Sequence, residues 1–405
     1  MLARLALLFL VPSLLSAQES AEALRIGSAE FQKRRATLLE RLPDAPLVLE
    51  SGKLKQVGDD ENTPLFDFKY LCGVHDDKGL LVIKDRKMTV FVSDPATAVP
   101  VADAVFPIGQ FAKWAEENLA GQVKIHAKLR GKNLELLQAA APKPEVTLSR
   151  LGSELTKLRL IKSETEIRLI RKASDATNAA HVAVMKALKP GMNEKELEKL
   201  IKSTFEQEGC PRVGFPSIVG AGKNGTILHY MKNNQEIPKN TLIVFDIGAE
   251  IENYVSDITR TLPTSGKYSD EQRKHYQCVL DAQKAAEAIL KPGATFGDLD
   301  RAARKVFEDR GLRKWSYAHS NDGQVRHGLG HYVGMSVHDS GGYRERFEPG
   351  MVITIEPGWY DKDAGYGIRI EDIYLVTKDG CERLSAGAPR EIEEIEKVMK
   401  GKRDF

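Results

Sequence analysis

Four acidic residues attract attention because each interrupts an otherwise apolar run. Asp246 lies in LIVFDIG and Asp257 in YVSDITRTL, while Glu356 follows MVITI and Glu371 follows GIRI. A carboxylate buried in an apolar strand is costly, and four buried together require cations to neutralise them. One such residue alone would read as an exposed or salt-bridged edge residue. Four of them at repeated positions predict a metal site.

Three histidines lie between these acidic segments, in the sequence HGLGHYVGMSVHD, at His327, His331 and His338. The four-residue spacing of the first two is that of a helical zinc motif. However, Gly328 and Gly330 disfavour a helix, and the glutamate of an HExxH motif is absent. We therefore expect a strand or a loop.

Four carboxylates with one neutral imidazole form an oxygen-rich set that suits manganese, iron, cobalt or zinc. Carboxylates can bridge two divalent ions roughly 3.5 to 4 Å apart, and such a pair activates water for hydrolysis. The cysteines make no CxxC pair, so a thiolate site is not supported, and we expect them to be mostly free and buried. They are Cys72, Cys210, Cys278 and Cys381.

The segments that must position these residues are duplicated. Residues 188–209 (LKPGMNEKELEKLIKSTFEQEG) align without gaps with residues 290–311 (LKPGATFGDLDRAARKVFEDRG). An amphipathic helix precedes each copy and opens with a capping box, in which side chains satisfy the free N–H groups of the first turn. The boxes are Ser163 with Glu166, and Ser269 with Gln272.

A β-rich stretch follows each copy. These stretches are residues 242–247 with 254–262, and residues 351–355 with 368–376. Two such helix-helix-strand units, packed about a pseudo-twofold axis, would bring equivalent strands together at the centre. Both halves would then contribute carboxylates to one site.

The 405 residues exceed the size at which single cores stop growing, so two domains are expected. Short β-rich runs occur at residues 47–49, 79–83 and 88–92. Together with the apolar-periodic segment 31–42 they predict a small α/β domain. We expect this domain to span residues 18–150 and a catalytic domain to span residues 155–400. The fold class is α/β.

The N-terminus has the pattern of a secretory signal, because Arg4 precedes the apolar run 5–15 and Ser16 and Ala17 follow it. The run is shorter than the about 20 residues that span a bilayer. We expect removal of residues 1–17 and export to the periplasm or the medium, without a membrane partner afterwards; an uncleaved anchor is the alternative. The net charge of +2, without a basic run, argues against nucleic acid. The oligomeric state stays open, and a homo-oligomer is one expectation.

Five residues occur in an order typical of one family: Asp246, Asp257, His331, Glu356 and Glu371. With the surrounding motifs ILHY, DITRT, HGLGH, VHD, EPG and GIRIED, this order resembles the pita-bread metallopeptidases. They include aminopeptidase P, prolidase and methionine aminopeptidase, and the resemblance covers about residues 155–400. LVLESG and FDFKYLCG are similar to the N-terminal domain of aminopeptidase P. The resemblance implies a C-terminal pita-bread fold in the aminopeptidase P and prolidase branch.

The resemblance also implies a role for each ligand. Asp257 and Glu371 would bridge both metal ions, Asp246 would complete one ion site, and His331 with Glu356 would complete the other. Glu356 would in addition carry protons to the leaving nitrogen. Two divalent ions are expected, with manganese first and cobalt, iron or zinc as alternatives.

Further residues match family positions around the substrate. His229 in ILHY and His338 in VHD match histidines that line the substrate site and take part in catalysis, and His327 matches a further pocket histidine. Arg369 would orient the metal-bound carboxylates, and Tyr360 would lie near the substrate. The alternative is a structural role for each histidine and a packing role for Tyr360.

The implied activity is release of the first residue from peptides with proline at position two. Prolidase, which shares the ligands but cleaves dipeptides, is the alternative. The prolidases carry a long insertion between the segments that match EPGWY and GIRIED, whereas the connection here is short. A non-catalytic binding module is a remote third reading, which the presence of all five ligands argues against.

Overall fold

The computed structural model describes residues 24–52, 63–94, 96–141, 145–147, 149–319 and 327–401. The predicted signal, residues 1–17, lies outside these ranges. None of the helices in the described ranges combines the length and hydrophobicity that a bilayer-spanning segment requires.

A mixed six-stranded sheet with the order β4-β3-β2-β1-β5-β6 organises the N-terminal part. Its strands are β1 (Leu47–Glu50), β2 (Leu80–Lys84), β3 (Lys87–Val92), β4 (Ala104–Pro107), β5 (Lys124–Lys128) and β6 (Glu145–Thr147). Its helices are α2 (Ser28–Arg41), α3 (Thr63–Cys72), α4 (Phe111–Leu119) and α5 (Gly131–Ala140), with the 3-10 turn η2 (Ile108–Gln110). β1 pairs antiparallel with β2 and parallel with β5. The three strands expected from the sequence are β1, β2 and β3.

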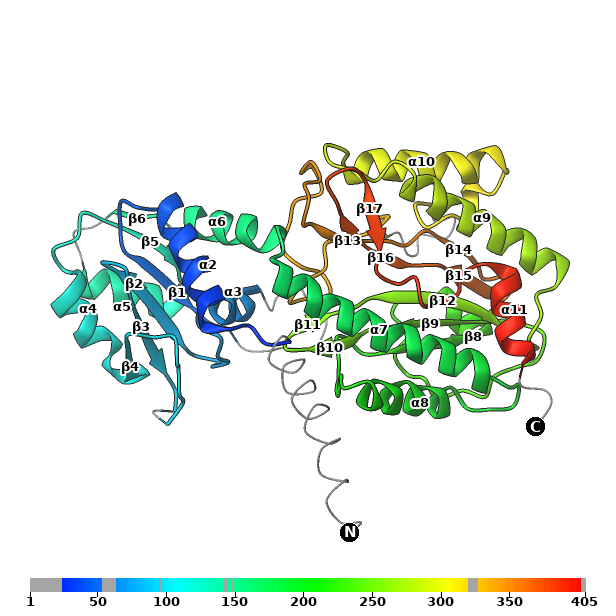
Figure 1. Ribbon diagram of the computed structural model, residues 1–405, viewed down its shortest axis with the longest axis horizontal. Coiled ribbons are helices and arrows are strands. Elements are labelled where there is room, and N and C mark those ends of the chain that lie inside the picture. Colours follow the sequence, from blue (N-terminus) through cyan, green and yellow to red (C-terminus); the bar gives the residue numbers. More distant parts are fainter. Residues whose placement is uncertain are drawn as a thin grey trace, which may run out of the picture.

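Helix α6 (Ser149–Leu160) runs from this sheet toward the larger C-terminal part (Figure 1). The sequence pattern indicated helix only from Ser163 onward, so α6 is an additional element. It contacts both β5 and α2.

The C-terminal part consists of two similar halves. The first contains α7 (Glu164–Ala187), α8 (Glu194–Gln207), β7 (Arg212–Val213), β8 (Ile218–Ala221), η3 (Gly222–Thr226), β9 (Leu242–Ile247), β10 (Ala249–Ile251), β11 (Tyr254–Val255) and β12 (Ile258–Pro263). The second contains α9 (Asp270–Glu287), α10 (Phe296–Asp309), η4 (Arg313–Trp315), β13 (Val352–Ile355), β14 (Gly358–Asp361), β15 (Tyr366–Arg369), β16 (Asp372–Val376), β17 (Cys381–Arg383) and α11 (Ile392–Lys400). The strands lie between α7 and α8 on one side and α9 and α10 on the other (Figure 1).

The helix starts confirm the predicted duplication. Both expected capping boxes are present, with Ser163 accepting from the Glu166 amide and Ser269 from the Gln272 amide. A second pair of boxes opens α8 and α10 at aligned positions: Asn193 with Glu196, and Thr295 with Asp298. The same local chemistry therefore starts equivalent helices in each half.

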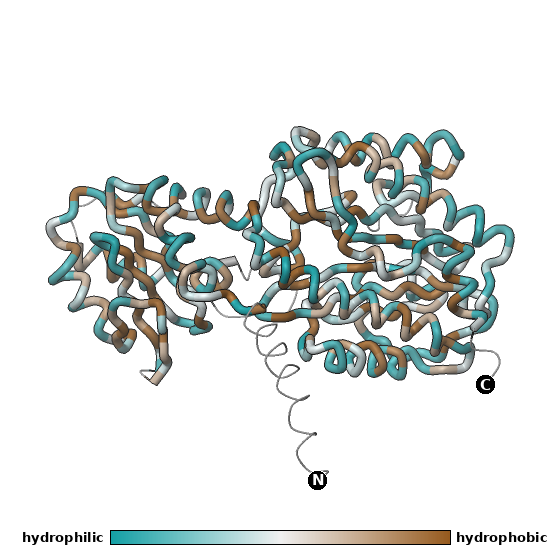
Figure 2. The backbone as a smooth tube through the Cα atoms, in the orientation of Figure 1, coloured by the Kyte–Doolittle hydropathy of each residue, from teal (hydrophilic) through white to brown (hydrophobic). Residues whose placement is uncertain are grey.

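The halves join along a seam of strand residues. Thr259 at the start of β12 and Glu371 before β16 form an isolated antiparallel bridge, with N···O distances of 3.3 and 3.0 Å. The chains approach closely nearby, because a Cβ on Gly367 would lie 2.1 Å from the carbonyl oxygen of Gly225. Hydrophobic residues from both halves form one core around this seam, and Figure 2 shows the strands as strongly hydrophobic segments.

Candidate metal centre

The four acidic residues converge where strands of the two halves meet. Asp246 lies in β9, Asp257 precedes β12, Glu356 follows β13, and Glu371 precedes β16. They line a cavity of about 300 Å³. Nine of the ten predicted site residues line this cavity: His229, Asp246, Asp257, His327, His331, His338, Glu356, Arg369 and Glu371. Tyr360 is the exception.

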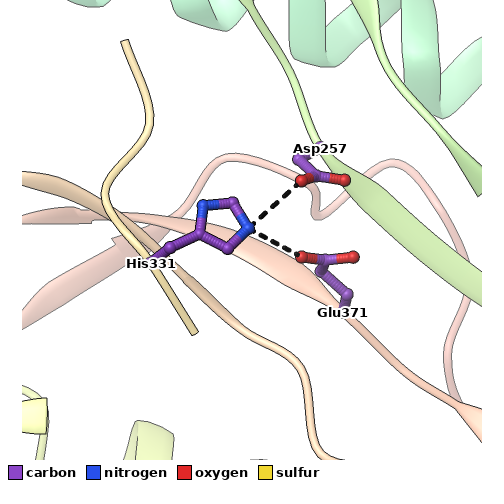
Figure 3. Close-up of side chains that lie close together, drawn as sticks. All are labelled: Asp257, His331 and Glu371. Atoms are coloured by element: carbon purple, nitrogen blue, oxygen red, sulfur yellow. Dashed lines mark ion pairs between the residues drawn. The ribbon is translucent and has the colours of Figure 1, made fainter. Parts of the chain in front are cut away.

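His331 points into the acidic cluster (Figure 3). Its Nε2 lies 3.4 Å from Asp257 Oδ2, 3.8 Å from Glu371 Oε1 and 3.5 Å from Glu356 Oε1. One ligand atom from each of Asp257, His331 and Glu371 lies within 4.8 Å of the other two. These distances leave room for an ion between the three side chains.

The segment that carries the histidines is a loop along β13, as expected from its glycines. Val333 N donates to Val352 O at 3.0 Å, and Thr354 N donates to His331 O at 2.8 Å. His331 Nδ1 lies 3.2 Å from the carbonyl oxygen of Tyr332, which turns Nε2 toward the carboxylates. Burial, with the neighbouring His338, lowers the pKa of His331 to about 3, so the imidazole is neutral. A neutral imidazole is the form that binds metals.

Asp246, Asp257 and Glu371 are buried and Glu356 is half-buried, so their negative charges repel one another. Burial and repulsion by neighbouring carboxylates raise the pKa of Asp257 and Glu356 well above their ordinary values. Burial and repulsion by Asp246 raise the pKa of Glu371 to about 8. Within the described residues, Asp246 Oδ1, Asp257 Oδ1 and Glu371 Oε1 have no hydrogen-bond partner. Divalent cations would satisfy these oxygens, so the residues present fit a metal centre.

Arg369 and Thr259 form hydrogen bonds that orient the side chains of Asp246 and Glu371. Arg369 Nη2 donates to Asp246 Oδ2 at 2.7 Å, and its Nε donates to Thr259 Oγ1 at 3.3 Å. Thr259 Oγ1 in turn donates to Glu371 Oε2 at 2.7 Å. The sequence analysis missed Thr259, although it lies in the DITRT motif two residues after Asp257.

The remaining predicted residues surround the cluster. His327 Nε2 lies 3.0 Å from the Tyr360 hydroxyl and its Nδ1 lies 3.5 Å from Glu356 Oε2. Tyr360 also accepts from Arg369 Nη1 at 3.2 Å, so it contacts the site through these two side chains. The His338 ring packs against the His331 ring with centroids 4.4 Å apart, and His229 lies exposed at the cavity.

Glu194, the first residue of α8, anchors the segment that carries His229. It is fully buried, and its carboxylate accepts four hydrogen bonds. The donors are Ala221 N and Tyr230 Oη at 2.9 Å, and Asn224 Nδ2 and Gln235 N at 3.0 Å. Sequence reasoning missed this role, because an acidic residue in the first helical turn has a sufficient explanation in the helix dipole.

The aligned position in the second half is Phe296, the first residue of α10. Its ring contacts those of Tyr332, Tyr343 and Phe347, with centroids 5.2, 5.3 and 5.0 Å apart. Tyr343 lines the cavity and is 60% exposed, and the sequence analysis did not predict it. The same helix position thus contacts a loop of the site in each half.

Comparison with known proteins assigns this arrangement to a family. The sequence profile of metallopeptidase family M24 matches residues 168–378, which contain all ten predicted site residues. The chain belongs to this family. Intermediate cleaving peptidase 55 of Arabidopsis thaliana is 32% identical over 96% of this chain and 86% of its own length. The Xaa-Pro aminopeptidase of Haemophilus influenzae is 32% identical over 94% and 99%, respectively.

Solved structures agree with this assignment. The aminopeptidase PepP of Pseudomonas aeruginosa has a TM-score of 0.82 and 27% identity, and the match covers 94% of this chain and all of that chain. The pita-bread fold and the aminopeptidase P branch expected from the sequence are thereby confirmed. This M24 protein is a metallo-aminopeptidase. It uses divalent metal ions and acts on peptides. The comparisons favour neither a non-catalytic binding module nor a prolidase.

Proposed function

We propose that this M24 peptidase is an exported, dinuclear Xaa-Pro aminopeptidase. The observation that supports it best is the buried cluster of four carboxylates and a neutral histidine, with three carboxylate oxygens lacking hydrogen-bond partners among the described residues. Relatives that match nearly the whole chain carry the name Xaa-Pro aminopeptidase. The match covers the N-terminal part as well as the catalytic part, which favours the same activity.

In this proposal Asp257 and Glu371 would be shared by two ions, Asp246 would complete one ion site, and His331 with Glu356 would complete the other. The short distances from His331 Nε2 to Asp257, Glu356 and Glu371 support this grouping. Manganese is proposed as the ion, with cobalt, iron and zinc as alternatives, because an oxygen-rich set with one nitrogen suits all four.

When bound, two such ions polarise the scissile carbonyl and lower the pKa of water. The side chains of the chain supply the rest. Glu356 lines the cavity, where it would carry a proton to the leaving nitrogen. His338 and His229 line the cavity and can donate hydrogen bonds to the substrate, with His327 and Tyr360 beside them. Arg369 keeps Asp246 oriented.

Release from longer peptides, rather than dipeptide cleavage, is supported by the hairpin β14-β15. Residues 362–365 alone connect the two strands, and Asp361 pairs with Tyr366 directly before and after the turn. A hairpin this short adds no segment that could close the cavity to long substrates. Proline at position two lacks an N–H and has a fixed φ, which gives a bent backbone that a shaped cavity can select.

The test is kcat/KM across a series of peptides at constant metal concentration. Xaa-Pro-Yaa tripeptides and longer peptides should be cleaved at least as well as Xaa-Pro dipeptides, and Xaa-Ala-Yaa should be left largely intact. Cleavage restricted to dipeptides would identify a prolidase. Equal cleavage of the alanine peptides would remove the proline requirement, an outcome that matters because the Arabidopsis relative's name does not mention proline.

Export is proposed from the signal pattern at Arg4 and residues 5–15. Protein recovered from the native host should begin near Gln18 when its N-terminus is sequenced. Recovery of a cytosolic form that retains Met1 would contradict export without touching the enzymatic proposal.

A further inference from the structure

A buried cluster of charges connects the N-terminal part to the loop of the catalytic site. Arg159 on α6 donates through Nη1 to Asp67 Oδ1 of α3 at 2.7 Å, and through Nη2 to Asp339 Oδ1. Lys162 Nζ lies 3.3 Å from Asp339 Oδ2, and Lys128 of β5 pairs with Asp67. The side chains of Asp67, Arg159, Lys162 and Asp339 are at most 2% exposed.

The cluster ends next to a residue that lines the catalytic cavity, because Asp339 directly follows His338. The Asp339 amide donates to Tyr332 O at 2.8 Å and closes the loop. The Asp339 carboxylate packs against the loop at Gly334, because a Cβ on this glycine would lie 2.1 Å from Asp339 Oδ2. The carboxylate therefore packs closely against the loop whose backbone carries His338.

We propose that Arg159 is a positioning residue that fixes His338 through Asp339, and that the N-terminal domain takes part through Asp67. An arginine that binds two carboxylates through separate nitrogens has a defined geometry. A buried charge that loses its partner is penalised, so the cluster favours one arrangement of α3, α6 and the loop. The inference rests on the proposed function, because it concerns the part that His338 plays in peptide hydrolysis.

The test compares two substitutions in the N-terminal part, Asp67→Asn and Asp44→Asn. Both remove a carboxylate that pairs with a lysine of β5, Lys128 and Lys124 respectively. Of these two carboxylates, Asp67 is the one that contacts Arg159. Asp67→Asn should lower kcat on an Xaa-Pro-Yaa peptide by about tenfold to a hundredfold, with a smaller change in KM and unchanged metal content. Asp44→Asn should stay within about twofold of the parent enzyme, the level of an uncoupled site.

A double-mutant cycle separates positioning from general destabilisation. In a His338→Ala background, Asp67→Asn should have no further effect, because the residue through which it acts is gone. The same fold-loss in that background would overturn the proposal, and so would parent-like activity of Asp67→Asn. If Asp67→Asn does not fold, Arg159→Lys serves in its place. Lysine keeps the positive charge but lacks the two guanidinium nitrogens that bind Asp67 and Asp339 separately.

Hydrogen exchange gives a readout that is independent of activity. Amides of residues 332–341 should exchange faster in Asp67→Asn than in the parent, and those in the Asp44→Asn protein should not. Unchanged exchange in this loop would overturn the inference. If the parent does not cleave Xaa-Pro-Yaa peptides, the proposed function fails, while the exchange measurement still decides whether the cluster holds the loop.

Discussion

At the scale of single residues, the candidate metal centre is a group of acidic side chains whose negative charges repel one another in the absence of cations. Asp257, Glu356 and Glu371 all have raised pKa values, with burial as the largest cause. The protonated forms are therefore favoured in the folded apoprotein. Metal ions must displace these protons, so folding, protonation and metal binding are linked at the same side chains.

This linkage predicts a pH dependence. The pKa of Glu371 is about 8 in the fold and 4.5 ordinarily, so its contribution to stability is present below 4.5 and lost as the pH rises through 8. Bound metal relieves the repulsion that causes this loss. The difference in Tm between metal-loaded and apoprotein, measured by calorimetry, should therefore widen from about pH 5 to about pH 8. A difference in Tm that stays constant with pH would contradict the linkage between protonation and metal binding.

Asp257→Asn tests the bridging position. The amide has the same shape but no charge, so at least one ion per chain should be lost when metal content is measured after dialysis. Asp363→Asn, on the exposed β14-β15 turn, is the matched control and should retain its metal. Full metal content and full activity in Asp257→Asn would exclude the assigned bridge.

His338→Ala tests a group that lines the cavity but is not a proposed ligand. We expect kcat/KM to fall by roughly 10² or more, the range for a positioned catalytic group, with metal content retained. His75→Ala, at a histidine whose side chain is 44% exposed in the N-terminal part, should leave kcat/KM unchanged. Turnover near the parent level in His338→Ala would return this residue to a structural role.

At the scale of elements, local signals were predictable and contacts between distant segments were not. The capping boxes at Ser163 and Ser269 were correct because each depends on residues three positions apart. The duplication and the motif context located the candidate site residues. The bridge of Thr259 to Glu371 and the contact of α6 with Asp339 were missed, because a sequence does not state which distant backbones will meet.

The seam between the halves can be tested at Gly367. A methyl group there would lie 2.1 Å from the Gly225 carbonyl oxygen, so Gly367→Ala must push β15 away from η3. We expect a loss of about 1–3 kcal/mol or more in the free energy of unfolding, measured with urea, as for overpacked cores. Gly121→Ala, where no atom lies within 4 Å of the added carbon, is the control. Equal free energies of unfolding for the two variants would mean that the two halves are not closely packed at Gly367.

At the scale of the whole molecule, the candidate metal centre lies where the two halves of the C-terminal part meet. Asp246 in β9 and Asp257 before β12 line the same cavity as Glu356 after β13 and Glu371 before β16, so ions bound by these residues would join the halves. Removing the ions should weaken the contact between the two halves as well as stop the reaction.

Chelation should therefore abolish hydrolysis and lower the Tm of the whole C-terminal part. Occupancy at 100 times the dissociation constant stabilises a protein by about 2.7 kcal/mol, which sets the scale of the loss. Manganese should be among the ions that restore both activity and Tm. Hydrolysis that continues in metal-free protein, verified by elemental analysis, would contradict the metal-centre assignment.

The anchors at the starts of α8 and α10 occupy the same position of the repeat but use different chemistry. Glu194 holds its loop with four hydrogen bonds, whereas Phe296, at the aligned position, holds its loop with aromatic contacts. Each residue fits only the loop that it contacts. An exchange of Glu194 and Phe296 between the halves should therefore preserve the site only if each loop is exchanged together with its residue.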